Sequence, residues 1–222
     1  FGVSPALCAS FAPEPRDPDL LALGPGTLHL PHATSLRMSD LGYRNRDQTA
    51  VNVSVNSLPD YLRDLQHATH TLHPPFAALG VCVDGEYRQL NANILQIENE
   101  YYSNIRLKRA PRAGESTMRA LARGGVEYVE VRALDICIFE PTGVCMDEMH
   151  FMEAFLALCL LRESEPFDAT AQQQFDHNHL LVARRGRERG LQLQRAGRAV
   201  ALQEWGAELL DQLGGICELL DA

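Results

Sequence analysis

The chain has 222 residues, 45% of them hydrophobic, and a formal net charge of −9 at pH 7. This length and composition suit a globular domain that buries its own core. The acidic balance disfavours a protein that holds a nucleic-acid backbone through bulk positive charge, and no apolar run approaches the roughly 20 residues that cross a bilayer.

The start of the chain and its cysteines indicate a cytoplasmic fragment. The chain begins with Phe1 rather than methionine, and no segment resembles a signal peptide, so we expect part of a longer protein. The six cysteines are irregularly spaced and include no C-x-x-C pair. This spacing fits neither a zinc module nor a disulfide scaffold, and it favours the reducing cytoplasm.

The first part of the chain predicts a long loop followed by a helix. Prolines and glycines concentrate in residues 11–31, a composition typical of a surface loop. Ser57 precedes an apolar stripe whose first turn contains Pro59, and this signal predicts a helix start. Pro74 and Pro75 should stop the helix, because proline disfavours helical backbone in the residue before it.

A hairpin is predicted next. Residues 77–83 have the composition of a strand. Asp84 and Gly85 are typical of a type I′ turn, whose two central residues need positive φ. We expect the chain to return as a second strand from Glu86.

Two later segments, residues 95–102 and residues 126–134, alternate between apolar and polar side chains, which predicts two strands with one polar face each. The polar faces carry carboxylates although glutamate is a poor strand former, so we interpret them as the lining of a charged cleft. A salt-bridged sheet face is the alternative. Arg132 shares a face with Glu130 and could grip a phosphoryl group. The carboxylates, which suit the oxygen-rich coordination of Mg²⁺, are Glu98, Glu100, Glu127 and Glu130.

Helical periodicity begins after Pro141. Apolar residues up to Leu160 predict a core helix, and we expect Cys159 to be a buried thiol within it. A second helix is predicted from Asn178 until Gly186, and a third, amphipathic helix lies near the C-terminus. Helices and mainly antiparallel strands without a regular βαβ rhythm indicate an α+β fold.

The sequence contains no P-loop, no Rossmann fingerprint and no nucleophile elbow. His67, His70 and His73 are spaced by three, and we favour an exposed helix end there over a metal site, because the following prolines disturb regular geometry. Two arginine-rich clusters, residues 106–123 and residues 184–198, are interpreted as solvated charge. For the first cluster, a clamp for nucleotide phosphates is the alternative.

Two long stretches carry a family resemblance. Gln89–Lys108 contains QLNANILQIENEYY, and Gly124–Asp135 contains GGVEYVEVR. Both resemble the proteobacterial glutamate–cysteine ligase family, and so do residues 30–43 and the opening residues 1–6. The resemblance extends to about Leu161 and becomes weaker toward the C-terminus.

The resemblance implies a ligase that joins the γ-carboxylate of L-glutamate to the amine of L-cysteine through a γ-glutamyl phosphate, the first step of glutathione synthesis. It implies ATP as co-substrate, Mg²⁺ or Mn²⁺ as cofactor, and small molecules rather than a nucleic acid or a membrane as partners. The implied fold is similar to glutamine synthetase: a curved, mostly antiparallel sheet with flanking helices, here incomplete. Residues 1–222 would form the C-terminal part of one catalytic domain, inactive alone because several metal ligands lie in the N-terminal half.

The same resemblance assigns roles to individual residues. Glu130 matches a metal ligand, Arg132 matches a catalytic arginine that faces the phosphoryl group, and Arg37 matches a residue placed for the carboxylate of cysteine. The substrate-binding set implied is Arg37, Tyr43, Tyr102 and Asn99. The residues matched to the phosphates of ATP are Arg106, Lys108 and Arg109. The alternatives are a salt bridge for Arg132, packing for the tyrosines and a charged loop for the three phosphate candidates.

Other functions stay open at this point. A related carboxylate–amine ligase with another amine acceptor would differ in its substrate preference. A non-catalytic fragment would bind substrates without joining them. A nucleic-acid role for the basic loops is a more distant third.

Overall fold

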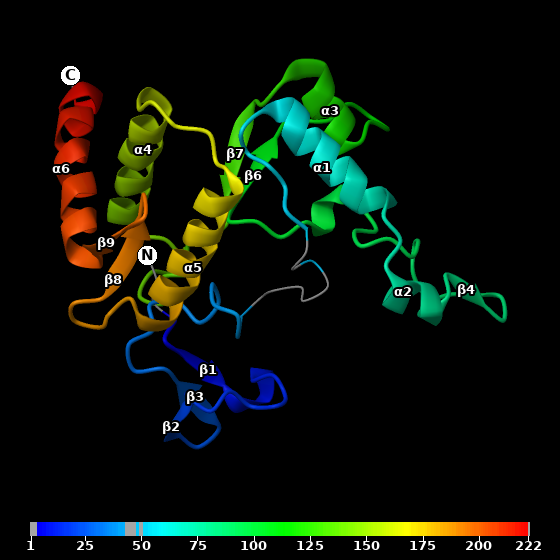
Figure 1. Ribbon diagram of the computed structural model, residues 1–222, viewed down its shortest axis with the longest axis horizontal. Coiled ribbons are helices and arrows are strands. Elements are labelled where there is room, and N and C mark those ends of the chain that lie inside the picture. Colours follow the sequence, from blue (N-terminus) through cyan, green and yellow to red (C-terminus); the bar gives the residue numbers. More distant parts are fainter. Residues whose placement is uncertain (1–3, 43–47, 49–50, 222) are drawn as a thin grey trace. The chain divides into compact units, whose positions relative to one another are not determined.

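The computed structural model describes residues 4–42, 48 and 51–221. The chain divides into two compact units, whose elements are labelled in Figure 1. Unit 1 consists of Phe1–Tyr43 and Leu134–Ala222, and unit 2 consists of Arg44–Ala133. The candidate site residues are distributed over both units.

A three-stranded antiparallel sheet opens unit 1. Its strands, in the order β1-β3-β2, are β1 (Ala6–Cys8), β2 (Leu21–Gly24) and β3 (Thr27–His29). Gly26, with a φ of +72°, lets the chain reverse between β2 and β3, because glycine adopts positive φ without strain. The prediction of a loop for residues 11–31 is therefore wrong where these two strands form. The buried side chains around this sheet are Leu20, Leu28, Leu30, Ala33 and Leu36.

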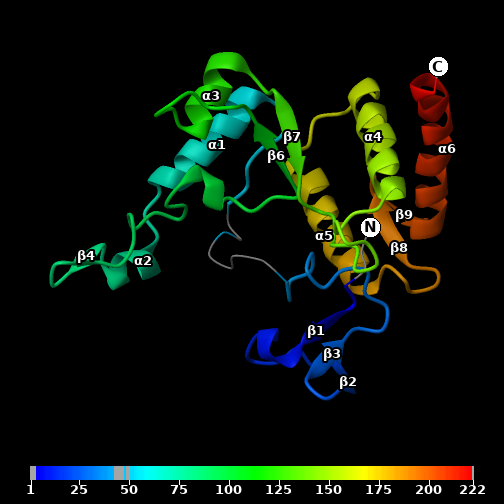
Figure 2. The same cartoon turned by 180° about the vertical axis from the view of Figure 1, so that it is seen from behind.

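Three helices and a hairpin complete unit 1. They are α4 (Met146–Leu161), α5 (Ala169–Arg185), β8 (Gln192–Arg195), β9 (Arg198–Ala201) and α6 (Leu202–Leu220). Helix α4 packs along α6, as Figures 1 and 2 show from opposite sides. The buried contact is made by Ala154, Leu158, Leu213 and Ile216. The three predicted helices are confirmed, although α5 begins earlier than its prediction.

Two features of this region differ from the sequence-based predictions. Cys159 is exposed rather than a core thiol. Helix α4 carries apolar side chains on all its sides, so periodicity alone does not indicate which side packs against α6. The β8–β9 hairpin was not predicted. Its turn residues Ala196 and Gly197 have φ values of 50° and 76°, as a type I′ turn requires.

Unit 2 is organised around its first helix. Its elements are α1 (Leu58–His70), α2 (Pro74–Leu79), β4 (Cys82–Val83), β5 (Glu86–Tyr87), β6 (Ile105–Lys108), α3 (Thr117–Gly124) and β7 (Tyr128–Val131). The core cluster combines side chains of α1 and α3 with side chains from the connecting segments: Val53, Tyr61, Leu65, Ala68, Leu95 and Leu121. The predicted helix from Leu58 is confirmed.

The start of α1 depends on a side-chain cap. Ser57 Oγ accepts a hydrogen bond from the backbone N–H of Asp60 at 3.2 Å. We expect Ser57→Ala to lower the free energy of unfolding by about 1 kcal/mol, because the first turn loses an acceptor for its free N–H groups. Urea denaturation of the purified chain measures this change. Ser57→Asn should restore most of the stability, and equal losses in both variants would contradict a capping role.

The predicted hairpin is confirmed, but the strand before it is mostly wrong. Strands β4 and β5 pair across Asp84 and Gly85, whose φ values are 53° and 83°. Within residues 77–83, only the end belongs to a strand. Pro74 and Pro75 begin α2, since proline is well suited to the first turn of a helix. The prolines that were expected only to end one helix therefore also start the next.

The strand predicted for residues 95–102 does not form. This segment contains a 3₁₀ turn, Glu98–Glu100. Glu100 Oε2 accepts a hydrogen bond from the backbone N–H of Gln96 at 2.7 Å, and the Asn91 amide donates to the Gln96 carbonyl at 2.9 Å. These local side chains satisfy the backbone groups that a neighbouring strand would otherwise bind.

The predicted α+β class with mostly antiparallel strands is confirmed. Among the described residues, the strands form one three-stranded and three two-stranded sheets, and each strand pair is antiparallel. In the same part of the chain, no helix combines the length and the apolar character needed to cross a bilayer.

Candidate functional site

Strands β6 and β7 form a ribbon that carries the candidate residues Arg106, Lys108 and Glu130 of unit 2. Arg106 lies opposite Glu130, and Lys108 lies opposite Tyr128. These four side chains share one face, since residues two apart in a strand point the same way. Leu107 points to the other face and packs against the core cluster of unit 2. The polar face predicted for the second alternating segment is confirmed, but its partner strand is β6.

Glu130, the candidate metal ligand, lies beside a cation. Lys108 Nζ is 3.3 Å from Glu130 Oε2, and this oxygen accepts no hydrogen bond from the described residues. The other carboxylates of the predicted cleft each accept a backbone N–H: Glu98 from Met118, Glu100 from Gln96 and Glu127 from Ala110. A single carboxylate fits one position around Mg²⁺, which takes several oxygen ligands. This face therefore offers one ligand rather than a complete metal site.

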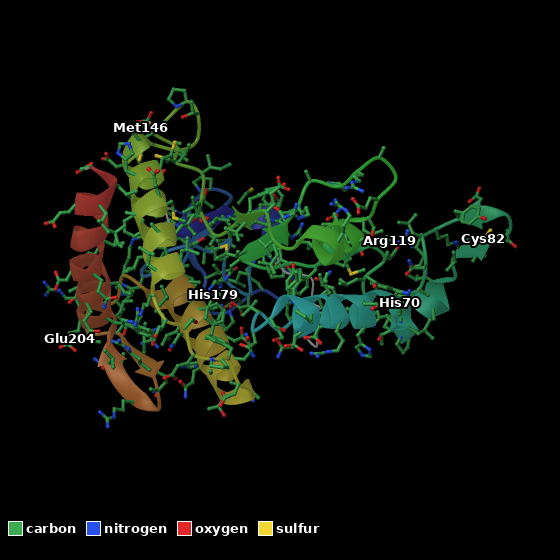
Figure 3. The ribbon with its side chains drawn as sticks, turned by 90° about the horizontal axis from the view of Figure 1, so that it is seen from above. His70, Cys82, Arg119, Met146, His179 and Glu204 are labelled. Atoms are coloured by element: carbon green, nitrogen blue, oxygen red, sulfur yellow. The ribbon has the colours of Figure 1, made fainter. Side chains whose placement is uncertain are left out.

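The histidines near the end of α1 make the contacts of an exposed helix end. His70 Nδ1 is 2.8 Å from the Gln66 carbonyl, and His67 Nε2 is 3.3 Å from Thr71 Oγ1. Figure 3 labels His70 at this end of the helix. Within the part of the chain that the structure describes, no three His, Cys, Asp or Glu side chains are grouped so that they could hold a metal ion.

Arg132 and Tyr102, two candidate residues, lie together. The guanidinium carbon of Arg132 is 5.7 Å from the centroid of the Tyr102 ring, a cation–π contact. The backbone N–H of Arg132 donates to the Asn104 carbonyl at 2.8 Å. Both residues were expected in two predicted strands whose polar faces line a charged cleft. The contact arises instead because Tyr102 precedes β6 and Arg132 follows β7, and these ends of the ribbon adjoin.

Gln48 holds the loop that carries Tyr102. Its side chain donates to the Glu100 carbonyl at 3.0 Å and accepts from the Tyr102 N–H at 3.1 Å. A primary amide offers both a donor and an acceptor, so one buried side chain fixes two backbone positions. Sequence reasoning missed Gln48 because no local pattern connects it with a residue 54 positions further along the chain.

Arg109, a phosphate candidate, is held at the end of α3. Its Nε donates to the Gly125 carbonyl at 2.6 Å, and a terminal nitrogen is 3.8 Å from Glu127. A Cβ at Gly124 would lie 2.7 Å from Arg109 Nε, so glycine leaves the room that this arginine occupies. Gly124 therefore leaves room for the Arg109 guanidinium, and Gly125 supplies the carbonyl that it binds.

Asn99, Arg106 and Lys108 line one small pocket in unit 2. Arg106 also donates to the Tyr101 carbonyl. Tyr61 lines the same pocket, and burial raises the pKa of its hydroxyl above the ordinary value of 10.0. The lining thus places a neutral phenol, an amide and two cations beside the carboxylate of Glu98 and several apolar side chains.

Arg37 lies in unit 1, where its side chain is fixed by two neighbours. Its Nε donates to Asp135 Oδ1 at 2.9 Å, and a terminal nitrogen donates to the Leu134 carbonyl at 2.6 Å. The side chain of Arg37 remains 37% exposed, whereas that of Asp135 is 3% exposed. Tyr43, the remaining substrate-binding candidate, lies outside the described residues.

The segment that carries Arg37 is attached to the end of α5. The Ala183 carbonyl accepts from the backbone N–H groups of Thr34 and Ser35 at 3.0 and 3.2 Å. His179, labelled on α5 in Figure 3, places its Nε2 2.9 Å from the Met38 carbonyl. These contacts hold the backbone on both sides of Arg37.

Arg184, also on α5, gathers carboxylates around the same segment. It forms ion pairs with Asp17 at 2.8 Å, with Asp40 at 3.0 Å and with Asp19 at 3.3 Å. Hydrogen bonding from Arg184 lowers the pKa of Asp17 below its ordinary value of 3.8. This pair therefore stabilises the fold above that pH, and the contribution is lost as the pH falls through the lowered pKa.

Arg184→Gln should lower the free energy of unfolding near neutral pH. The difference in this free energy between the variant and the unaltered chain should become smaller in acid, because Asp17 becomes protonated in both proteins. Unfolding free energies measured from about pH 7 to about pH 2 test this expectation. Asp17→Asn should likewise differ from the unaltered chain in unfolding free energy near neutral pH and differ less in acid. A difference between the proteins that stays constant throughout the acid range would contradict it.

Comparisons with known proteins all indicate the same family. Residues 1–182 match the family model for glutamate-cysteine ligase. The whole chain is 49% identical to the glutamate–cysteine ligase of Shewanella amazonensis and 50% identical to that of Shewanella oneidensis, over 222 residues in each case. Each alignment covers 100% of this chain and 42% of the relative. The chain thus spans less than half the length of these curated relatives.

A solved structure agrees with these relatives. The chain superimposes with a TM-score of 0.92 on the crystal structure of the glutamate–cysteine ligase of Francisella tularensis in complex with AMP, at 35% sequence identity. The match covers 98% of this chain and 44% of that chain. Family model, relatives and fold agree, and the chain belongs to the glutamate–cysteine ligase family.

Proposed function

We propose that the ligase containing these residues uses ATP to join the γ-carboxylate of L-glutamate to the amine of L-cysteine in the cytoplasm. ATP phosphorylates the γ-carboxylate, the cysteine amine attacks the γ-glutamyl phosphate, and phosphate leaves with formation of the amide. This reaction is the first step of glutathione synthesis. The observation that carries the proposal is the 48–50% identity of the entire chain to glutamate–cysteine ligases.

The contact between Arg132 and Tyr102 supports a catalytic role for Arg132. Negative charge on the transferring phosphoryl oxygens is stabilised best by a cation that is already in position. The ring of Tyr102 limits the positions of the Arg132 guanidinium, and Gln48 in turn holds the backbone of Tyr102. We assign Arg132 to the phosphoryl group and Tyr102 to the wall of the cysteine site.

The remaining assignments follow the polar face of the ribbon and the loop of Arg37. We propose Glu130 as one of the Mg²⁺ or Mn²⁺ ligands, the others being supplied by parts of the ligase beyond this chain. The bound cation would supply positive charge at the phosphate oxygens. Arg37, with Tyr43 and Asn99, is proposed to bind substrate. Arg106, Lys108 and Arg109 are proposed to lie near the phosphates of ATP.

A hybrid enzyme tests this proposal. In it, residues 1–222 replace the matching 42% of the Shewanella oneidensis ligase. We expect the hybrid ligase to release phosphate only when ATP, glutamate and cysteine are all present, and to form γ-glutamylcysteine that mass spectrometry detects. We expect residues 1–222 alone to be inactive, because Glu130 by itself cannot hold the metal.

The same hybrid separates the alternative functions. A substrate panel in which another amine replaces cysteine without loss of rate would favour a related carboxylate–amine ligase. Binding of cysteine or ATP without turnover would favour a non-catalytic binding segment. Both units are assigned to one catalytic domain, and loss of turnover when either unit of the hybrid is replaced by unrelated sequence is the expected result.

A further inference from the structure

Asp135 is the last residue of the Gly124–Asp135 stretch, yet none of the roles above uses it. Its carboxylate is at the centre of a polar cluster in unit 1. Oδ2 accepts a hydrogen bond from Ser4 Oγ at 2.6 Å. Oδ1 accepts from Ser35 Oγ at 2.9 Å and from Arg37 Nε at 2.9 Å. The cluster thus joins residues that are up to 131 positions apart in the sequence.

The ion pair between Asp135 and Arg37 is asymmetric. The acid side chain is 3% exposed and the basic side chain 37% exposed. A buried carboxylate is unfavourable unless donors surround it, and here Ser4 and Ser35 supply neutral donors beside the arginine. The acid is therefore buried among three donors, whereas the arginine side chain is partly exposed.

The geometry of the contact constrains how Arg37 points. Nε binds Asp135 and a terminal nitrogen binds the Leu134 carbonyl, so two directions of the planar guanidinium are set by unit 1. The backbone next to Arg37 is set independently by α5, through Ala183 and His179. A long arginine side chain normally has many rotamers, and fixing both its ends removes most of them.

We propose that Asp135 is a positioning residue for substrate binding: it orients the guanidinium of the partly exposed Arg37 toward the carboxylate of the acceptor amino acid. The proposal rests on the proposed role of Arg37 in the cysteine site. A guanidinium binds a carboxylate through a planar, two-point contact whose strength depends on orientation. Asp135 sets that orientation before the substrate arrives, so substrate binding need not order the side chain.

Asp135→Asn in the hybrid ligase tests the proposal, because the amide keeps the shape of the carboxylate but loses its charge. The Kd and KM for cysteine should rise by about 10- to 100-fold. The KM for ATP and the kcat at saturating cysteine should change little. Glu188→Gln is the matched control: it removes a carboxylate in unit 1 that Arg185 binds at 2.6 and 2.7 Å, away from Arg37. It should leave all four constants unchanged.

A second readout excludes a merely structural role. Cysteamine lacks the carboxylate of cysteine, so preference for cysteine over cysteamine reports the contact with Arg37. Asp135→Asn should reduce this preference. Asp135→Glu, which keeps the charge but moves the carboxylate by one methylene, should reduce it as well. Thermal unfolding of each variant establishes that it is folded at the assay temperature.

The outcomes distinguish the inference from the proposed function. If the unaltered hybrid binds no cysteine, the proposed function and the positioning role of Asp135 are both contradicted. If it binds cysteine and the folded Asp135 variants keep the same affinity and the same preference, the positioning role is overturned and the proposed function stands. If the KM values for ATP, glutamate and cysteine all rise in parallel, Asp135 is a structural residue only and the inference is overturned.

Discussion

Arg132→Ala in the hybrid ligase should lower kcat by about 10²- to 10³-fold, while the KM for ATP changes little. The loss falls on kcat because the arginine stabilises charge that develops on the phosphoryl oxygens in the transition state. Steady-state phosphate release at saturating substrates measures it. The magnitude is large because the Tyr102 ring already limits where the Arg132 guanidinium can lie.

A conservative variant and a control variant help to interpret the result for Arg132→Ala. Arg132→Lys keeps the charge but loses the planar group that lies over the Tyr102 ring, so its rate should be intermediate. Arg123→Ala is the control, because Arg123 is bound by Glu115 on the surface of unit 2 and has no proposed role in the reaction. An alanine variant at Arg132 that retains most of its kcat would remove this residue from the catalytic machinery.

Leu95→Ala should lower the free energy of unfolding by about 2–5 kcal/mol. The side chain of Leu95 is fully buried in the core cluster of unit 2, and its backbone N–H donates to the Ala68 carbonyl at 3.2 Å. Truncation removes apolar contacts and leaves a cavity beside α1 and α3. Urea denaturation of residues 1–222, followed by circular dichroism, measures the loss.

Leu90→Ala provides the matched comparison in the same signature stretch. Leu90 is 69% exposed, so its truncation should change stability by no more than about 0.5 kcal/mol. Similar losses for the two variants would show that Leu95 does not contribute to a packed core. The hybrid ligase should tolerate Leu90→Ala with unchanged activity.

Helices with one apolar stripe and a cap could be predicted from the sequence, because their signals are local. Ser57 and Pro59 mark the start of α1 correctly. Asp84 and Gly85 mark a hairpin because few residue pairs accept positive φ twice. The prediction of a strand for residues 95–102 was wrong because the alternation of apolar and polar residues describes the side chains only. Whether a strand forms depends on the backbone hydrogen bonds, which Glu100 and Asn91 satisfy locally.

The sequence indicates which residues to propose for the site, and these assignments stay predictions, but it does not indicate their contacts. The resemblance named Arg132 and Tyr102, and the structure brings them together. It could not indicate that Gln48 holds Tyr102 or that Asp135 holds Arg37, because both contacts join distant segments. Such partners are set by the way the chain folds back on itself, and no spacing rule connects them.

The attachment of the Arg37 segment to α5 also bears on how the family can diverge. The family model ends at residue 182, one position before Ala183. Ala183 acts through its backbone carbonyl, which any amino acid possesses. Gly186 is different, because a Cβ there would lie 2.5 Å from the methyl group of Thr34. Most side chains beyond the family model can therefore change without removing the backbone contact of Ala183, provided that position 186 stays without a side chain.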